Sequence, residues 1–247
     1  MTKGVVITGG SRGIGAAAAR LLAQQGWAVC INYRQRSDAA LALVEEIRDH
    51  GGTAIAIAGD VASENDVLKL FDTAERAFGR ISGLVNNAGI LAPASHLADM
   101  DLDRWNATIT INLTGVFLCA REAVRRMGRS RGGSGGAIVN VSSMAAILGA
   151  ATEFIDYAAA KGAVDTLTIG LAKEVATDGI RVNGVRPGLI ETDIHALSGV
   201  DRIAKLVPSI PIQRVGTPDE VASAIAWLLS DAASYCCGTT INVSGGR

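Results

Sequence analysis

Short apolar runs rich in β-branched residues alternate with longer amphipathic or alanine-rich segments along the chain. Several short runs are too apolar to alternate between polar and apolar positions, as expected of strands that are covered on both faces. The predicted strands are Gly4–Thr8, Ala28–Tyr33, Thr53–Ala58, Gly83–Asn86, Ala137–Val141, Ile180–Arg186 and Thr239–Val243. The predicted helices are Ile14–Gln25, Ala39–His50, Glu64–Phe78, Trp105–Arg126, Ile155–Thr177 and Pro218–Leu229. This order is typical of an α/β fold with a parallel sheet.

Two segments show neither the apolar run of a strand nor the apolar stripe of a helix. Arg129–Gly136 is basic and rich in glycine, and we expect it to form a turn. Pro187–Thr217 is long enough to include a substrate lid, at about residues 188–216. Because the chain of 247 residues shows no linker, we expect a single domain over 1–247.

Composition narrows the classes of function. Hydrophobic residues make up 49% of the chain and charged residues 19%, which excludes a disordered or fibrous protein. The net charge of −1 gives no reason to expect nucleic acid or a membrane surface as a partner, so a small molecule is the expected ligand. The 29 glycines are more than usual and indicate tight backbone turns.

The cysteines and histidines show no spacing that suits a metal, so we expect reduced thiols, no metal site and a cytoplasmic protein. The polar start of the chain and the lack of an apolar stretch of about 20 residues favour neither a signal peptide nor a membrane span. The cysteines and histidines of the chain are Cys30, Cys119, Cys236, Cys237, His50, His96 and His195.

The first predicted strand runs into a turn that carries Gly9, Gly13 and Gly15 and then into an alanine-rich helix. Glycines at such a turn let the backbone approach a pyrophosphate, which the N–H groups of the helix N-terminus hold. The triplet alone is equally consistent with an ordinary tight turn. Its place after the first strand, with the second strand ending about 20 residues later, favours a dinucleotide-binding unit.

Tyr157 and Lys161 are four residues apart on a predicted helix, so their side chains lie on one face. We expect the Lys161 ammonium to lower the pKa of the Tyr157 phenol toward the working range, although an exposed pair on a helix surface is the alternative. Ser143 ends the fifth predicted strand, where its hydroxyl can donate to a developing oxyanion. Ser142 suits that role equally well.

In order along the chain, several motifs resemble those of the short-chain dehydrogenase/reductase family over the full length, in particular its glucose-dehydrogenase-like and 3-oxoacyl-carrier-protein-reductase-like members. They are the G-x-x-x-G-x-G turn, Asn86-Asn87-Ala88-Gly89, Ser143, Tyr157-x-x-x-Lys161 and Pro187-Gly188. The resemblance implies a doubly wound, Rossmann-type parallel sheet of seven strands with helices on both faces, NAD(P)(H), and reversible reduction of a carbonyl to an alcohol. The segment from Ser143 to Tyr157 is one residue longer than the family's commonest spacing.

The resemblance also assigns catalytic roles. It makes Tyr157 the proton donor, Ser143 the group that polarises the carbonyl, and Lys161 the residue that holds the nicotinamide ribose. The backbone carbonyl of Asn112 would hold a water that links Lys161 to solvent, although a bare Asn in an apolar helix is more often a kink or a buried hydrogen-bond partner. The residues expected at the cofactor are Gly9, Ser11, Arg12, Gly13, Ile14, Gly15, Tyr33, Arg34, Asp60, Val61, Asn87, Ala88, Gly89, Tyr157, Lys161, Pro187, Gly188, Ile190 and Thr192.

The end of the second strand bears on cofactor choice, because an acidic residue there bonds the ribose 2′-hydroxyl of NAD. This chain has Tyr33 and Arg34 at that place, and Arg12 in the glycine turn adds a second guanidinium suited to a phosphate. NADP(H) is therefore favoured. Asp38 is better interpreted as a first-turn acid of the next helix, with Ser37 as its N-cap.

The substrate stays open between two options: a sugar or small secondary alcohol, which the lid's resemblance to that of glucose-dehydrogenase-like members implies, and a 3-oxoacyl thioester on acyl carrier protein. The second option draws on basic residues that could meet an acidic carrier, although such residues usually form a solvated face. These residues are Arg125, Arg126, Arg129, Arg131 and Lys173. Glu153 and Asp156 could face the mouth of the site or act only as helix-start acids, and His195 could touch substrate or face solvent. A non-catalytic dinucleotide-binding regulator is a further alternative, which the four catalytic residues disfavour.

The predicted helix Ile155–Thr177 is small or apolar around most of its circumference, whereas a helix on a sheet needs one apolar stripe. We therefore expect a homo-oligomer built on this helix and on Trp105–Arg126. The family resemblance implies a homotetramer.

Overall fold

The computed structural model describes residues 3–192 and 205–247. Within these residues, seven parallel strands form one sheet in the order β3-β2-β1-β4-β5-β6-β7. The chain builds outward from β1 to β3 and then returns to place β4 on the other side of β1, which is the doubly wound order. This confirms the predicted fold class. The strands are β1 Gly4–Ile7, β2 Ala28–Tyr33, β3 Thr53–Ala58, β4 Ile81–Asn86, β5 Gly136–Val141, β6 Ile180–Pro187 and β7 Thr240–Val243.

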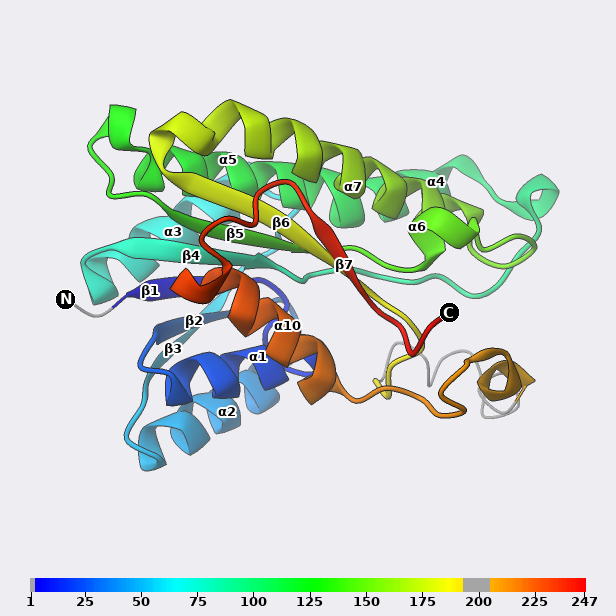
Figure 1. Cartoon of the computed structure of the whole chain (residues 1–247), viewed down its shortest axis with the longest axis horizontal. Coiled ribbons are helices and arrows are strands. Elements are labelled where there is room, and N and C mark those ends of the chain that lie inside the picture. Colours follow the sequence, from blue (N-terminus) through cyan, green and yellow to red (C-terminus); the bar gives the residue numbers. More distant parts are fainter. Residues whose placement is uncertain (1–2, 193–204) are drawn as a thin grey trace.

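Helices cover both faces of the sheet (Figure 1). Helices α1, α2 and α10 bury apolar residues such as Leu22 and Ile225 on one face, and α3, α5 and α7 bury others such as Phe71 and Met127 on the opposite face. The helices are α1 Gly13–Gln24, α2 Ser37–Asp49, α3 Glu64–Phe78, α4 Leu102–Ile109, α5 Gly115–Met127, α6 Ala145–Leu148, α7 Ile155–Val175 and α10 Pro218–Leu229. The carboxyl ends of all seven strands lie at one edge, because all of them run parallel.

The predicted helix Trp105–Arg126 differs from the structure in two ways. It begins earlier, at Leu102, because the Asp101 side chain caps it by accepting from the Arg104 amide at 2.7 Å. A π-helical turn at Thr110–Thr114 then divides it into α4 and α5. Such turns are rare in proteins, and those that occur often lie at functional sites.

Smaller differences concern the ends of elements. Ser37 lies inside α2 and Arg36 occupies the N-cap position, so the predicted capping role of Ser37 is wrong. Asp38 lies in the first turn of α2 as predicted. The predicted turn at Arg129–Gly136 contains a single 3₁₀ turn, and β5 begins at its last residue.

Helix α6 was not predicted, because its four residues are too few to show a period. Part of the predicted lid at about 188–216 falls outside the described residues, as does His195. By length and composition alone, one helical stretch of the described chain, Leu102–Met127, could cross a membrane. Half of that stretch is buried inside the fold, as in the core helix of many proteins.

Candidate active site

Two adjoining cavities lie along the carboxyl ends of the strands. The arginine-rich cavity is bordered by the segments that follow β1, β2, β3 and β4, and the tyrosine cavity by those that follow β4, β5 and β6 and by the start of α7. Four residues border both cavities, which therefore form one cleft: Ile14, Asn87, Gly89 and Thr192. Ligands of doubly wound sheets bind at this edge.

Nearly all predicted site residues line the cleft. The arginine-rich cavity contains Gly9, Ser11, Arg12, Gly13, Ile14, Tyr33, Arg34, Asp60, Val61, Asn87, Ala88, Gly89 and Thr192. The tyrosine cavity contains Ser143, Tyr157, Lys161, Pro187, Gly188 and Ile190. Of the predicted residues, Gly15 and Asn112 stand behind the described walls and line neither cavity.

The turn between β1 and α1 depends on glycine at two positions. Gly9 has φ +59° and Gly13 has φ +53°, in the left-handed region that other residues rarely adopt. A Cβ on Gly13 would also lie 3.2 Å from Cγ2 of Thr192, which faces the turn across the cleft. The turn can therefore bring backbone N–H groups close to a ligand at the start of α1.

Asn87 fixes this turn from the end of β4. Its Nδ2 donates to the Thr8 carbonyl at 3.0 Å and to the Gly9 carbonyl at 2.9 Å. In return, the Thr8 hydroxyl accepts from the amides of Asn87 and Ala88, both at 3.0 Å. Strand β1 ends at Ile7, one residue before the predicted Thr8. A Cβ on Gly15 would lie only 2.6 Å from Asn87 Nδ2, so Gly15 serves the packing of the turn.

Positive charge dominates the arginine-rich cavity. Arg12, Arg34 and Arg36 line it, and Asp60 is the one carboxylate among the described lining residues. Arg34 Nε lies 3.2 Å from Asp60 Oδ2. Tyr33 stands at the end of β2 as predicted, with no acidic residue in its place.

Sequence reasoning missed Arg36, which forms a two-point contact with Asp38 through Nε and Nη2, both at 3.1 Å. It also missed Asn32, whose Oδ1 accepts from the Gly9 amide at 3.3 Å and whose Nδ2 donates to the Gly59 carbonyl at 3.0 Å. An asparagine inside an apolar strand is the signal that could have found the second residue.

Tyr157 lies in the first turn of α7, with its side chain at the tyrosine cavity. Burial raises the pKa of Tyr157 to about 12, and a hydrogen bond with the Ser143 side chain lowers it by less. The expectation that Lys161 brings this pKa down is therefore wrong for the described structure. The phenol is protonated at neutral pH, which is the form that can donate a proton.

Lys161 follows one helical turn later, and its Nζ lies 5.5 Å from the centroid of the Tyr157 ring. The side chain is only 3% exposed, and its Nζ donates to the Val141 carbonyl at 2.8 Å. Burial lowers the pKa of Lys161 to about 8, against an opposing effect of Asp165. The ammonium is thus held inside the site but gives up its proton more readily than an ordinary lysine.

The two candidate serines have different partners. The buried Ser142 donates from Oγ to the Lys161 carbonyl at 3.2 Å. Ser143 bonds with Tyr157, and its Oγ also accepts from the Ala145 amide at 3.1 Å. Of the two serines, Ser143 is the one in contact with the Tyr157 hydroxyl.

Asn112 lies in the π-helical turn and is fully buried. Its Oδ1 accepts from the Ile90 amide at 3.1 Å, and its Nδ2 donates to the carbonyls of Ile90 and Thr108 at 3.0 Å. A Cβ on Gly89 would lie 2.7 Å from Asn112 Oδ1 and 3.7 Å from Lys161 Nζ. Asn112 thus fixes the segment after β4 next to the lysine.

The side chains of the two acidic residues before Tyr157 lie in different surroundings. Glu153 lines the tyrosine cavity, as expected. Asp156 is only 1% exposed and bonds with Arg104, so the expectation that it faces the mouth of the site is wrong. The partner lies 52 residues away in the chain, which no local pattern could reveal.

Most of the remaining wall of the tyrosine cavity is apolar and was not predicted. It includes Leu91, Met144, Leu148, Phe154 and Leu189, while Arg247 adds a basic residue. Between Ser143 and Tyr157 the chain forms α6 and a tight turn in which Ala150 and Thr152 have positive φ.

Comparisons with known proteins find related oxidoreductases. Residues 9–247 match the model of a protein family described as enoyl-(acyl carrier protein) reductase. Over 243 residues, 98% of either protein, the chain is 50% identical to a protein of Escherichia coli (strain K12) called uncharacterized oxidoreductase YgfF. It is 43% identical over 242 residues to a 3-oxoacyl-[acyl-carrier-protein] reductase of Synechocystis sp., covering 98% of this chain and 95% of that protein.

A solved structure shows the same relationship. The crystal structure of a dehydrogenase/reductase from Sinorhizobium meliloti 1021 matches with a TM-score of 0.92 at 31% identity, covering 100% of this chain and 95% of that one. The family match and the relatives cover nearly the whole chain. The chain therefore belongs to the short-chain dehydrogenase/reductase family, whose members are oxidoreductases that use nicotinamide dinucleotides.

Proposed function

We propose that this chain interconverts a carbonyl and a secondary alcohol with NADP(H), and that Tyr157 is the group that gives or takes the proton. The observation that carries the proposal is the meeting of Tyr157, Ser143 and Lys161 at one wall of a cavity that opens into the arginine-rich cavity. Tyr157, Ser143 and Lys161 form a proton-transfer site, and the arginine-rich cavity suits a phosphorylated dinucleotide.

The residues of the arginine-rich cavity fit NADP(H) in chemistry. The positive φ of Gly9 and Gly13 leaves backbone room for a pyrophosphate at the start of α1. Arg12, Arg34 and Arg36 line the cavity with guanidinium groups suited to a 2′-phosphate, of which Arg34 also contacts Asp60 and Arg36 also contacts Asp38. When bound, NADP(H) would supply a hydride to the carbonyl carbon or take one from the alcohol.

The chain's own residues would handle the oxygen and its proton. Tyr157 is protonated at neutral pH, which lies far below its pKa of about 12, and would donate to the carbonyl oxygen in reduction. Ser143 would donate a hydrogen bond to the same oxygen as its negative charge develops. Lys161, with its pKa lowered to about 8 by burial, is suited to return a proton to the tyrosinate.

The wall of the tyrosine cavity bears on the substrate. Its side chains Leu91, Met144, Leu148, Phe154 and Leu189 are apolar. A sugar would place several hydroxyl groups against them and lose hydrogen bonds to water, whereas an apolar ring or chain would gain by leaving water. This favours a carbonyl on an apolar carbon skeleton over a sugar.

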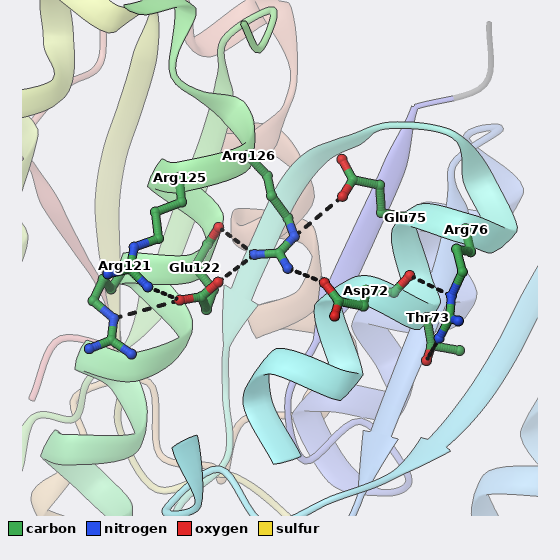
Figure 2. A network of polar contacts seen from close by, with 8 residues as sticks. All are labelled: Asp72, Thr73, Glu75, Arg76, Arg121, Glu122, Arg125 and Arg126. Carbon is green, nitrogen blue, oxygen red and sulfur yellow. Dashed lines mark hydrogen bonds and ion pairs between the residues drawn. The ribbon is translucent and has the colours of Figure 1, made fainter. Parts of the chain in front are cut away.

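A 3-oxoacyl thioester on acyl carrier protein is the second candidate, since one relative carries that name. The basic residues expected to meet the carrier are partly engaged elsewhere. Figure 2 shows Arg126 between Glu122 of its own helix and Asp72 and Glu75 of α3. Arg125 also contacts Glu122 at 2.7 Å, although its side chain is half exposed. Two of the five positive charges are therefore already compensated.

A homotetramer remains part of the proposal. Four large apolar side chains on α4, α5 and α7 are exposed: Leu102, Trp105, Phe117 and Ile169. Contact with further copies of the chain would remove them from water. Light scattering that gives four times the mass of one chain at micromolar concentration would agree, and a monomer would refute this part.

The function is tested with purified protein, NADPH or NADH, and three substrate groups: apolar cyclic ketones, sugars, and a 3-oxoacyl thioester with and without its carrier. We expect NADPH oxidation with the cyclic ketones. A carrier-dependent gain with the thioester would favour the second candidate. NADPH binding with no turnover in any group would contradict both and favour a non-catalytic dinucleotide-binding protein.

A further inference from the structure

A buried ion pair lies directly beside Tyr157 and has no part in the proton transfer described above. The side chain of Asp156 is 1% exposed and that of Arg104 is 15% exposed. Arg104 meets the carboxylate at two points, with Nε 3.0 Å from Oδ2 and Nη2 3.3 Å from Oδ1. A two-point contact fixes both distance and orientation, which a single contact does not.

Asp156 ties the first turn of α7 to α4. Besides Arg104, it accepts from the hydroxyl of Thr108 at 3.0 Å and from the backbone amide of Tyr157. Burial raises the pKa of Asp156, but these hydrogen bonds outweigh burial and hold the pKa below its usual value. The carboxylate is therefore charged at neutral pH and needs its partners.

Arg104 also holds the two loops that border the tyrosine cavity. Its Nη1 donates to the Pro93 carbonyl at 2.6 Å, in the segment after β4. Its Nη2 donates to the Glu153 carbonyl at 3.4 Å, in the segment before α7. The Ser95 amide bonds the same carbonyl at 3.0 Å and joins the two loops directly.

The contacts continue from Asp156 to Asn112. Thr108 offers its hydroxyl to Asp156, and its carbonyl accepts from Asn112 Nδ2 at 3.0 Å. Asn112 in turn binds both the amide and the carbonyl of Ile90. One connected set of bonds thus runs from the residue before Tyr157 to the segment that passes Lys161.

We propose that Arg104 and Asp156 are positioning residues, which hold the first turn of α7 so that the Tyr157 hydroxyl stays in line with Ser143 and the substrate oxygen. This inference rests on the proposed role of Tyr157 as proton donor. A buried ion pair is a weak source of stability, since apolar residues often replace one at no loss, but its geometry is specific. A misplacement of about 1 Å can lower a rate by about a hundredfold.

The decisive variant is Arg104→Lys. Lysine keeps the positive charge that Asp156 needs, so folding and NADPH affinity should stay close to those of the wild type. It cannot make the two-point contact and also reach the carbonyls of Pro93 and Glu153. We expect kcat to fall by about tenfold or more, with little change in the Kd of NADPH or the thermal midpoint. Arg20→Lys is the matched control, because Arg20 makes a two-point contact with Glu46 at the surface.

Hydrogen exchange of the amides at 155–158 supplies a readout that does not need a substrate. Exchange should speed up in Arg104→Lys and stay unchanged in Arg20→Lys. Thr108→Val, which removes one of the bonds to Asp156, should have a smaller effect in the same direction. An Arg104→Lys variant with the kcat and amide exchange of the wild type would overturn the inference. A variant that loses thermal stability and NADPH affinity together with kcat would also overturn it, because that result means a general structural role. If the wild type turns over no substrate, the proposed function fails, while exchange still decides whether Arg104 holds this turn.

Discussion

Arg34 lies within ion-pair distance of Asp60, with 3.2 Å between Nε and Oδ2, across the ends of two neighbouring strands. Asp60 therefore competes with any phosphate for the guanidinium that follows Tyr33. The side chain of Arg34 is 56% exposed and that of Asp60 31%, so the pair is screened by solvent and can open. We therefore expect the preference between NADPH and NADH to depend on the balance between that carboxylate and the surrounding arginines.

We expect the unmodified protein to favour NADPH over NADH by at least about tenfold in kcat/KM, since charged hydrogen bonds contribute about 1.5–3 kcal/mol each before screening. The preference should shrink as salt rises. Asp60→Asn should increase it, because the carboxylate that holds Arg34 and repels phosphate is gone. Kinetics with both cofactors at low and high salt measure this.

Replacing Tyr33 with Asp and Arg34 with Gln should reverse the preference, because the new carboxylate accepts from the ribose hydroxyl and repels a phosphate. Arg20→Gln, at an exposed pair with Glu46, serves as the control and should leave the ratio unchanged. An NADH preference in the unmodified protein would mean that Asp60 wins the competition for Arg34.

Tyr157→Phe removes the proton and keeps the ring. Turnover should fall by at least about a hundredfold, the usual loss of a general acid, while the Kd of NADPH stays the same. The control is Tyr235→Phe at a fully exposed tyrosine, which should leave both quantities alone. The measurements are steady-state kinetics and NADPH fluorescence titration. Substantial turnover by the first variant would place the proton donor elsewhere.

Lys161→Met should abolish turnover and yet stabilise the fold near neutral pH. Burial lowers the pKa of Lys161 to about 8 from 10.5, so the unfolded chain binds more protons than the folded one between these values. The cost of the folded ammonium is fully present below about pH 8 and disappears as pH rises through 10.5. Near pH 7 this cost is on the order of 3 kcal/mol at most, and the gain from removing it is reduced by the loss of the hydrogen bond to the Val141 carbonyl.

Urea denaturation at pH 7 and at pH 10 gives the difference in unfolding free energy between this variant and the wild type. The difference should be large at pH 7 and small at pH 10. Burial also raises the pKa of the Cys30 and Cys119 thiols, but both proteins share that titration and it cancels. Lys173→Met, which removes an exposed lysine from the same helix, is the control. A constant difference would mean that Lys161 carries no buried charge.

The cluster in Figure 2 predicts a stability effect away from the cleft. The side chain of Glu122 is 2% exposed and contacts Arg121, Arg125 and Arg126. Glu122→Gln should cost about 2–3 kcal/mol of unfolding free energy, below the ~3–5 expected of a fully buried pair, because Arg125 is half exposed. Denaturation measures it.

Glu64→Gln is the matched variant, because Glu64 also contacts Arg121 but is 58% exposed. It should change the unfolding free energy by less than about 1 kcal/mol. Equal effects of the two substitutions would show that burial of Glu122 adds nothing.

The arrangement of strands and helices was predictable because each strand is a short apolar run and each covering helix is long enough to show its period. The glycine turn, the Tyr157–Lys161 pair and the end of β2 were found for the same reason: their spacing is local. The π-helical turn at Thr110–Thr114 was not, because one extra residue in a helical turn leaves no mark on an apolar pattern.

The spacing of residues in the sequence did not reveal how deeply the side chains of the site are buried or which distant residues they contact. That Lys161 follows Tyr157 by one turn was correct, but burial, which decides the pKa values of both, depends on segments far away in the chain. The same holds for Asp156, whose partner Arg104 comes from α4. Arg36 lies two residues beyond Arg34 and past the end of β2, where its place in the chain gives no sign that it lines the cavity.

The π-helical turn at Asn112 makes chain length itself a determinant of this site. Its hydrogen-bonded ring holds one residue more than a ring of the regular α-helix. The wide turn takes up this extra residue, so α4 and α5 keep the facing that a regular helix would give them. Deleting one residue from Thr110–Thr114 would restore a regular helix without turning α4 away from Asp156, and it would remove the bulge that sets Asn112 against Ile90. Among related sequences, a gap of one residue in this turn should therefore disturb Asn112 and spare the pairing of Arg104 with Asp156.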